Sequence, residues 1–238
     1  MCPYFLVLSN ENDFKIFLDA GFKAALEDNF IIPLDEATTW ERGLSKMAKR
    51  HLKMARKDLI VSTLIPEEFI RLYAMHLSAR RRKPNAALPV AQAILVEATR
   101  HGQARVMTAC RRDTGEIEAA VASLWDKNKY YYWMTTRRTP VVGETKPHPG
   151  AIKLLLYTAI ADAHAKGLAF DFDGVPSDLP EKKNGVTRLY AGMGAKKSVR
   201  YKVRRETFVE RLASLIRTPI KLVPRNTIGR FVTLKLNY

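Results

Sequence analysis

The fold is decided by residues 150–195, GAIKLLLYTAIADAHAKGLAFDFDGVPSDLPEKKNGVTRLYAGMGA. Apolar residues recur at helical spacing over residues 151–166, and Gly167 marks the end of that helix. A short apolar strand at 168–172 follows and ends in acidic residues. A polar loop leads to a short helix at 187–193 that is closed by glycines. This order predicts a helix packed on a strand that carries carboxylates to the edge of a ligand site.

Length and composition indicate a folded domain with a large excess of positive charge. The 238 residues are 47% hydrophobic, which is enough to bury a sizeable core. Forty Lys and Arg against 24 Asp and Glu give a net charge of +16, so we expect an anionic partner or co-substrate. Two cysteines cannot build a disulfide framework. With no signal peptide and no membrane span in the sequence, we expect a cytoplasmic protein.

The rest of the sequence predicts helices and strands on both sides of the opening stretch. We expect strands at 4–8, 59–65, 104–111, 116–125, 129–135, 168–172 and 197–204, and helices at 11–30, 40–58, 66–83, 88–100, 151–166, 187–193 and 206–216. One or two more strands fall within 221–236. Polar turns join the strands within 104–135, which predicts an antiparallel meander. A boundary near Asp58 divides a segment over 1–58 from a domain over 59–238.

Three segments carry a family resemblance. KRHLKMARKDLIVSTLIPEEFIRLYAMHLSARR (49–81) resembles the basic helix, strand and following helix of the Fem-type aminoacyltransferases. LLLYTAIADAHAKGLAFDFDG (154–174) looks like the helix and FDFxG strand of the same group, and GVTRLYAGMGA (185–195) looks like its closing FKxGFGA element. This group also holds cellulose-associated and exopolysaccharide acyltransferases, and it is part of the GNAT acyltransferase superfamily.

The resemblance implies a GNAT fold of the α/β (α+β) class, in which helices flank a mixed, mostly antiparallel central sheet. Residues 1–58 would be the remnant of a first GNAT-like domain. The implied activity is transfer of an acyl or aminoacyl group to an amine of a small-molecule or peptide acceptor, with acyl-CoA or aminoacyl-tRNA as co-substrate and no tightly bound cofactor. The alternative is a catalytically silent GNAT-like module that binds RNA, tRNA or another anionic partner. In an active enzyme we expect a gap between the strands at 116–125 and 168–172.

Two departures from the family leave the donor open. The Phe-Lys pair of the closing element falls on Leu189 and Tyr190, so a lysine that is thought to serve the donor end in that family is missing. The Gly-rich pyrophosphate loop of coenzyme A-using GNAT enzymes is replaced by VVGETKPHPGA (141–151). The start of the next helix remains as an anion site. The candidate donor-binding residues are Lys146, His148, Gly150 and Arg188.

Asp173, Tyr190 and Asp171 are the candidate catalytic residues. At alternate positions of a strand, Asp171 and Asp173 share one face and could orient or deprotonate an ammonium group. The alternative is that Asp171 caps a loop and Asp173 begins a turn with Gly174. Tyr190 lies where GNAT enzymes often place a tyrosine that protonates the leaving group. The alternative there is a tyrosine packed on the core.

The candidate acceptor-binding residues come from a helix end and an aromatic strand. They are His76, Arg80, Arg81, Tyr132 and Trp133. Arginine forks bind phosphate or carboxylate bidentately, and one face of the aromatic strand could line an acceptor pocket. Core packing is the alternative for half of the aromatic residues, and a structural role is the alternative for the histidine. The five histidines show no metal-ligand spacing, so we expect no metal.

The C-terminal tail adds a possible nucleic-acid surface. Between Lys196 and Tyr238, twelve Lys and Arg residues stand against two Glu residues. Together with the basic helix, they would form a face that follows the phosphates of tRNA or another nucleic acid. The candidate residues are Lys49, Arg50, Lys53, Lys196, Lys197, Arg200, Arg204 and Arg205.

Overall fold

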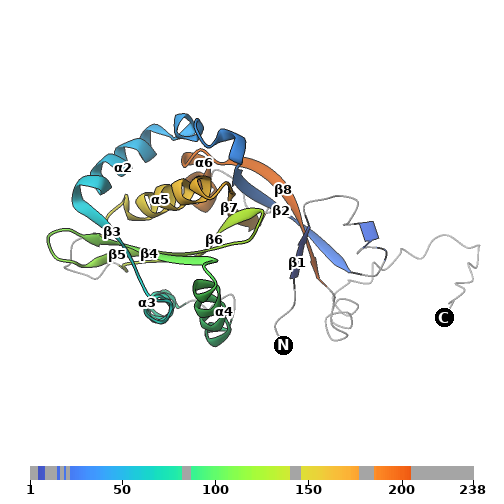
Figure 1. The fold of residues 1–238 in the computed structure, drawn as a ribbon, viewed down its shortest axis with the longest axis horizontal. Helices are drawn as coiled ribbons and strands as arrows, with labels where there is room; N and C mark the ends of the chain where they lie inside the picture. The colour runs from blue at the N-terminus through green and yellow to red at the C-terminus, as the bar shows by residue number, and fades with distance from the viewer. Residues whose placement is uncertain are drawn as a thin grey trace, which may run out of the picture. The chain divides into compact units, whose positions relative to one another are not determined.

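An eight-stranded sheet with the order β1-β8-β2-β7-β6-β5-β4-β3 organises the chain (Figure 1). This computed structural model describes residues 5–8, 15–16, 19, 22–81, 87–139, 146–176 and 185–204. All strand pairs are antiparallel except β6 with β7, which is parallel. The expected mixed, mostly antiparallel sheet flanked by helices is therefore confirmed. The helix and strands expected at 206–216 and within 221–236 lie outside the described residues.

The elements follow one another in the order that the sequence predicts, with one exception near the N-terminus. The strands are β1 (Phe5–Leu8), β2 (Lys23–Ile32), β3 (Leu59–Thr63), β4 (Ala104–Arg111), β5 (Ile117–Trp125), β6 (Lys129–Arg137), β7 (Ala169–Pro176) and β8 (Lys196–Arg204). The helices are η1 (Leu34–Glu36), η2 (Trp40–Gly43), α2 (Lys46–Asp58), α3 (Pro66–Ala79), α4 (Leu88–Arg100), α5 (Ala151–Ala165) and α6 (Gly185–Gly192). The meander β4-β5-β6 is confirmed.

The exception is the second half of the predicted helix over residues 11–30, whose described residues 15–16 and 19 are helical. Residues Lys23–Ile32 instead form β2, which pairs with β8 on one side and β7 on the other. Along β2 the apolar side chains of Phe30 and Ile32 enter the core, while Glu27 and Asn29 are buried among polar groups of β7 and β8. Pairing with two strands far along the chain outweighs the local helical spacing of the phenylalanines.

Helices cover both faces of the sheet and give it two cores. On one face α5 lies between the sheet and α2, so it is apolar on two sides, and Leu155, Leu156 and Ile160 are fully buried (Figure 1). On the other face α3 and α4 bury Phe69 and Leu95 against β4 and β5. Replacing a fully buried leucine by alanine costs about 2–5 kcal/mol, so these cores fix the frame in which the site is built.

Local signals explain where α2 and α3 begin. Ser45 caps α2, because its Oγ accepts a hydrogen bond from the Ala48 N–H at 3.1 Å. Pro66 begins α3 and is followed by Glu67 and Glu68 in the first turn, where carboxylates favour the positive end of the helix. The division at Asp58 stays a prediction, and α2 and β2 from the segment before it share this core and sheet with the rest.

Candidate active site

The two parallel strands β6 and β7 part near the middle of the sheet. Their ladder joins Lys129 to Ala169, Tyr130 to Phe170 and Tyr131 to Asp171, and it ends there. Beyond this point β7 continues beside β2. The expected gap between the strands at 116–125 and 168–172 is wrong as stated, because β6 lies between them; the strands that part are β6 and β7. Carboxyl ends of parallel strands that diverge are a common place for a ligand.

A bulge in β6 lies next to the parting. Ser123 of β5 pairs with Tyr132, whereas the adjacent Ala122 pairs with Met134, so Trp133 is the extra residue of β6. A bulge bends its strand and leaves one residue out of the ladder, which re-aims its backbone groups. This one lies just after the last pair that β6 makes with β7.

A second bulge, in β7, positions Asp173. Between the pairs Asn29–Gly174 and Ile31–Asp171, β7 has two residues opposite one of β2. Asp173 takes a φ of 76°, a left-handed conformation that favours glycine. Its carboxylate is 59% exposed and lies 2.5 Å from the Arg200 guanidinium.

Arg200 ties three strands together on this side of the site. It lies on β8 and donates to Glu27 on β2 at 3.1 Å and 2.9 Å, as well as binding Asp173 on β7. Its side chain lies directly over Gly174, because a Cβ added there would lie 2.4 Å from the guanidinium. The Arg200 guanidinium thus holds Asp173 in place, and Gly174 leaves the room that this guanidinium needs.

Asp171 has different surroundings from Asp173. It is only 3% exposed, and it accepts hydrogen bonds from Lys129 at 3.1 Å, Asn29 at 3.4 Å and the Asp173 N–H at 2.9 Å. These bonds fasten the turn of β7, so the geometry favours the structural alternative for Asp171. Asp173 is the carboxylate that is open to a ligand.

Tyr190 lies on α6 with its ring inside an aromatic cluster. Its ring centroid is 4.8 Å from that of Phe172, 5.7 Å from that of Phe30 and 6.0 Å from that of Tyr132. Burial raises the pKa of Tyr190, and the nearby Tyr132 and Asp173 raise it further. The hydroxyl therefore keeps its proton at working pH.

The two aromatic residues proposed for the acceptor lie in different cores. Tyr132 packs in the core under α5, and burial raises its pKa to about 12. Trp133 packs on the core under α3 and α4. The two side chains therefore lie on opposite faces of the sheet, and a pocket lies beside α3, the helix that carries His76.

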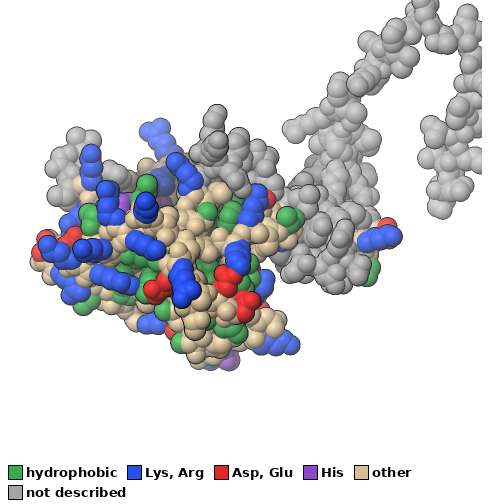
Figure 2. Space-filling view, turned by 90° about the horizontal axis from the view of Figure 1, so that it is seen from above, with side chains coloured by type: hydrophobic (Ala, Val, Ile, Leu, Met, Phe, Trp, Pro, Cys, Tyr) green, Lys and Arg blue, Asp and Glu red, His purple; other side chains and the backbone are tan. Residues whose placement is uncertain are grey.

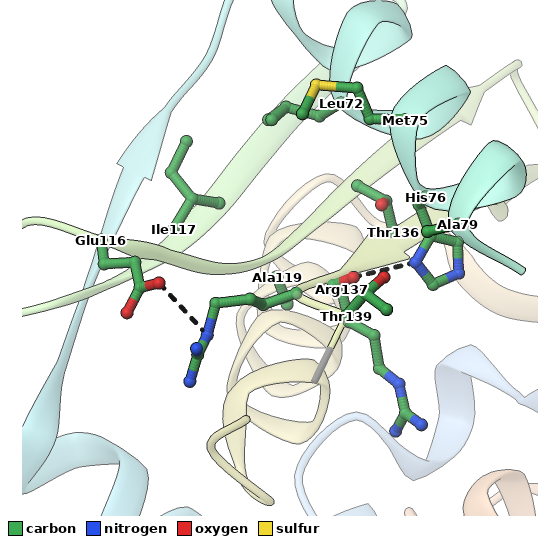
Figure 3. Close-up of a pocket in the computed structure, with 11 residues that line it drawn as sticks. Leu72, Met75, His76, Ala79, Glu116, Ile117, Ala119, Thr136, Arg137 and Thr139 are labelled. Atoms are coloured by element: carbon green, nitrogen blue, oxygen red, sulfur yellow. Dashed lines mark hydrogen bonds and ion pairs between the residues drawn. The ribbon is translucent and has the colours of Figure 1, made fainter. Parts of the chain in front are cut away.

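That pocket lies between α3 and the strands β5 and β6, with a volume of about 340 Å³. Figure 3 shows its lining, which consists of Leu72, Met75, His76, Ala79, Glu116, Ile117, Ala119, Thr136, Arg137, Arg138 and Thr139. His76 donates from Nδ1 to the Arg137 carbonyl at 2.8 Å, which joins α3 to the end of β6. Arg80 and Arg81 follow α3 directly and are exposed, outside the lining.

The predicted donor-binding residues His148 and Gly150 are packed against protein. The His148 side chain is 6% exposed, its Nε2 lies 3.3 Å from Asp58, and its Nδ1 accepts from the Gly150 N–H at 3.1 Å. A Cβ at Gly150 would lie 2.4 Å from the His51 carbonyl, so α2 presses directly on the start of α5. At this helix start, the Gly150 N–H already donates to the His148 ring and the Ala151 N–H to the His148 carbonyl.

A buried carboxylate holds the segment before α5. Glu118 accepts from the His148 N–H at 2.8 Å and from Arg111 at 2.5 Å, and it also pairs with Arg138. Burial alone would raise the pKa of Glu118, but these hydrogen bonds hold it below the ordinary value. Lys146 is exposed in this segment, and its carbonyl accepts from Arg111 at 3.5 Å. Arg188, the remaining donor candidate, lies apart from them on α6.

The predicted nucleic-acid surface divides into two parts. Lys49, Arg50 and Lys53 are exposed on α2, and Figure 2 shows Lys and Arg side chains spread over this side of the molecule. On β8 the cations are paired with carboxylates: Lys196 with Glu36, Lys197 with Asp28 and Arg200 with Glu27. The side chain of Arg204 and the whole of Arg205 lie outside the described residues.

Sequence reasoning missed the residues that hold the carboxylates. Lys129 and Asn29 orient Asp171, and Arg200 has this role at Asp173 and not a place on an open basic surface. No local pattern marks these residues, because each lies more than 25 positions from its partner. Only the order of strands in the sheet brings them together.

A sheet whose parallel strands part beside a bulge, with a tyrosine-bearing helix after the second strand, defines the class of GNAT-fold acyltransferases. Residues 42–183 match the family described as the acetyltransferase (GNAT) domain. The chain belongs to this family and is an acyltransferase. The expected GNAT fold and enzyme class are thereby confirmed.

Solved structures share the fold at low sequence identity. FemX superimposes with a TM-score of 0.63 at 12% identity, over 87% of this chain and 71% of that one. The C-terminal domain of a lysylphosphatidylglycerol synthetase from Agrobacterium fabrum gives 0.57 at 15% identity, over 87% and 69%. L-PGS from Bacillus licheniformis gives 0.56 at 13% identity, over 87% and 69%. No curated protein sequence matches the chain.

Within the described ranges, no helix is long and apolar enough to cross a bilayer. The same part of the chain contains no group of three or more His, Cys, Asp or Glu side chains placed to hold a metal ion.

Proposed function

We propose that the chain transfers an acyl or aminoacyl group to an amine at the parting of β6 and β7. The observation that carries this proposal is the position of Asp173 and Tyr190, which flank the end of the β6–β7 ladder and influence each other electrostatically. FemX and a protein named for lysylphosphatidylglycerol, an aminoacylated lipid, share the fold and support an acyl or aminoacyl cargo.

Each residue has a defined part in the proposed reaction. The amine nitrogen attacks the carbonyl carbon of the donor, and a new C–N bond replaces the C–S bond of a thioester or the C–O bond of an ester. Asp173 attracts the incoming ammonium group and takes the proton that the amine loses. Backbone N–H groups at the Trp133 bulge stabilise the negative oxygen that forms. Tyr190 gives its proton to the leaving sulfur or oxygen.

The Tyr190 hydroxyl bears on the donor as a source of a proton. A thiol has a pKa of about 8.5 and can leave as the anion, whereas the hydroxyl of a ribose ester is a much weaker acid and needs a proton to leave. In the proposed reaction the Tyr190 hydroxyl supplies that proton to the ester, whereas the thioester does not require it. Acyl-CoA and charged tRNA are both proposed as donors, and the effect of removing the Tyr190 hydroxyl distinguishes them.

The apolar pocket beside α3 is the proposed place for the body of the acceptor. Leu72, Met75 and Ile117 supply apolar contact, and His76 fixes the end of β6 beside them. β6 leads from the Trp133 bulge directly to this pocket. Arg80 and Arg81, beyond the lining, would meet an anionic group of the acceptor.

Single substitutions test the proposal. Transfer from acetyl coenzyme A and from charged tRNA is measured over a panel of amines for Asp173→Asn, Tyr190→Phe and the unchanged protein. We expect Asp173→Asn to lower kcat/KM about 100-fold or more with either donor. Tyr190→Phe should lower it strongly with the ester donor and much less with the thioester. Thermal unfolding of each variant serves as the folding control, and unchanged transfer in both variants would refute the assignment.

A further inference from the structure

Strand β3 forms one end of the eight-stranded sheet, where it joins α2 to α3 and pairs only with β4 (Figure 1). Its five residues keep one unbroken register with β4, from the pair Leu59–Arg111 to the pair Thr63–Met107. The strand at the other end of the sheet, β1, has four residues. The outer side of β3 is therefore an open strand edge in the described part of the chain.

This edge lacks the features that usually keep edge strands from pairing with other chains, which are charged side chains, proline and bulges. Residues 59–65, LIVSTLI, include no charged residue and no proline, and the pairing of β3 with β4 has no bulge. Two apolar side chains of this stretch reach solvent, since Ile60 is 46% exposed and Ile65 is 63% exposed. The stretch therefore has the composition of a strand that pairs on both of its sides.

Backbone hydrogen bonds show which groups of β3 face outward. The Arg112 N–H donates to the Asp58 carbonyl at 3.0 Å, and the Leu64 N–H donates to the Val106 carbonyl at 3.1 Å. In an antiparallel pair such bonds occur at every second residue, so the even-numbered residues of β3 bond to β4. The odd-numbered residues 59, 61 and 63 thus direct their backbone groups to the open edge.

We propose that β3 pairs antiparallel with β3 of a second copy of this chain and joins two sheets into one. A two-fold axis at Val61 fits the outward groups, because it places Val61 opposite Val61 of the second copy and Leu59 opposite Thr63. The two Val61 residues then exchange both of their backbone hydrogen bonds, and each Thr63 N–H donates to the Leu59 carbonyl. The Leu59 N–H is not needed for this pairing, and it already donates to the Ala55 carbonyl at the end of α2.

Charge complementarity favours a second copy as the occupant of this edge. In the proposed register Lys57 comes opposite Ile65 of the second copy, which directly precedes the first turn of α3 with its Glu67. Lys57 and Glu67 are both exposed, and neither forms an ion pair among the described residues. The two-fold axis brings this pair of opposite charges together twice, whereas no charged residues face each other between the two ends.

The inference is independent of the proposed function. Strands β4, β5 and β6 lie between β3 and the parting of β6 and β7, so the pairing uses no residue of the proposed site. A variant that loses the pairing should therefore keep its transfer activity, and a failure of one proposal leaves the other standing.

Two double variants test the pairing and its register, because position 60 faces position 62 of the second copy. Ile60→Lys with Ser62→Lys sets like charges directly opposite each other on both sides of the axis, which is destabilising. Ile60→Lys with Ser62→Glu sets opposite charges at the same positions. Sedimentation equilibrium should show a dimer for the unchanged protein and for the Lys/Glu variant. The Lys/Lys variant should associate about tenfold more weakly or worse.

The measurement is made at about 0.15 M salt, where screening limits the repulsion between two chains of net charge +16. Positions 60 and 62 are exposed, so all three proteins should unfold at similar temperatures, which is the folding control. A monomeric unchanged protein would overturn the proposal and leave the edge to a strand of a different protein. Equal association of all three proteins, or equal weakening in both double variants, would also overturn it.

Discussion

Helix α2 and strand β8 carry similar runs of Lys and Arg, but the cations of β8 form ion pairs within the protein and those of α2 are exposed to solvent. On β8, Lys197 and Arg200 find carboxylates on β2, and Lys196 finds one on η1. On α2, Lys49, Arg50 and Lys53 are exposed, and no ion pair within the described ranges includes them. The positive charge of a segment therefore indicates an external partner only where its side chains have no carboxylate partners within the protein.

The largest expected effect comes from breaking a paired cation. Arg200→Met leaves Glu27 and Asp173 without their guanidinium, and the loss of one partner of a mostly buried ion pair costs about 3 kcal/mol or more. Urea unfolding should show this loss. The matched control Lys53→Met, on α2, should change the free energy of unfolding by less than about 0.5 kcal/mol. Equal losses would mean that the two regions do not differ.

A smaller effect is expected on the binding of tRNA. Lys49→Gln with Lys53→Gln should lower the slope of log K against log salt by about 1.8, because each phosphate contact contributes about 0.9. Lys196→Gln with Lys197→Gln removes the same number of charges from paired positions, and we expect almost no change of slope. Filter binding over a range of salt concentrations measures both variants. An equal fall in slope would place β8 on the binding surface.

The smallest expected effect is a pH dependence of stability that comes from His51 on α2. Burial lowers the pKa of His51, and the nearby charges of Lys153 and Arg50 lower it further. When the pKa of a histidine is lower in the folded state than in the unfolded state, the neutral ring has no effect on stability above about pH 6.5. The free energy of unfolding then falls as acidification protonates the ring. Between pH 7 and 5, the unchanged protein should therefore lose more stability than His51→Gln. Parallel unfolding curves for the two proteins would refute this effect.

The parts of the fold that depend on local pattern could be predicted from the sequence. Helix α4 has the predicted bounds, and α5, β7 and α6 follow the order expected from residues 150–195. Strand β2 was missed because its partners lie on β7 and β8, far along the chain. Tyr190 was proposed because GNAT enzymes often place a tyrosine there. The structure puts its ring against Phe172 of β7, and its catalytic role stays a prediction.

Contacts between distant strands explain what the sequence alone could not give. The pairing of Arg200 with Glu27 spans 173 positions, so the basic tail could not be divided into paired and free cations beforehand. The bulge at Asp173 lies in the pairing of β7 with β2, two strands that are far apart in the sequence. The closure of the α5 start by His51 likewise depends on how α2 crosses it.

The left-handed backbone at Asp173 carries a cost in stability. Glycine adopts a φ of 76° without the penalty that an aspartate side chain meets, so position 173 is one at which the protein accepts a less favourable backbone. What it keeps in return is a carboxylate on an exposed turn. Glycine at position 173 would relieve this backbone cost but would also remove the ion pair with Arg200, so we expect the two effects on stability to offset each other while the proposed transfer falls.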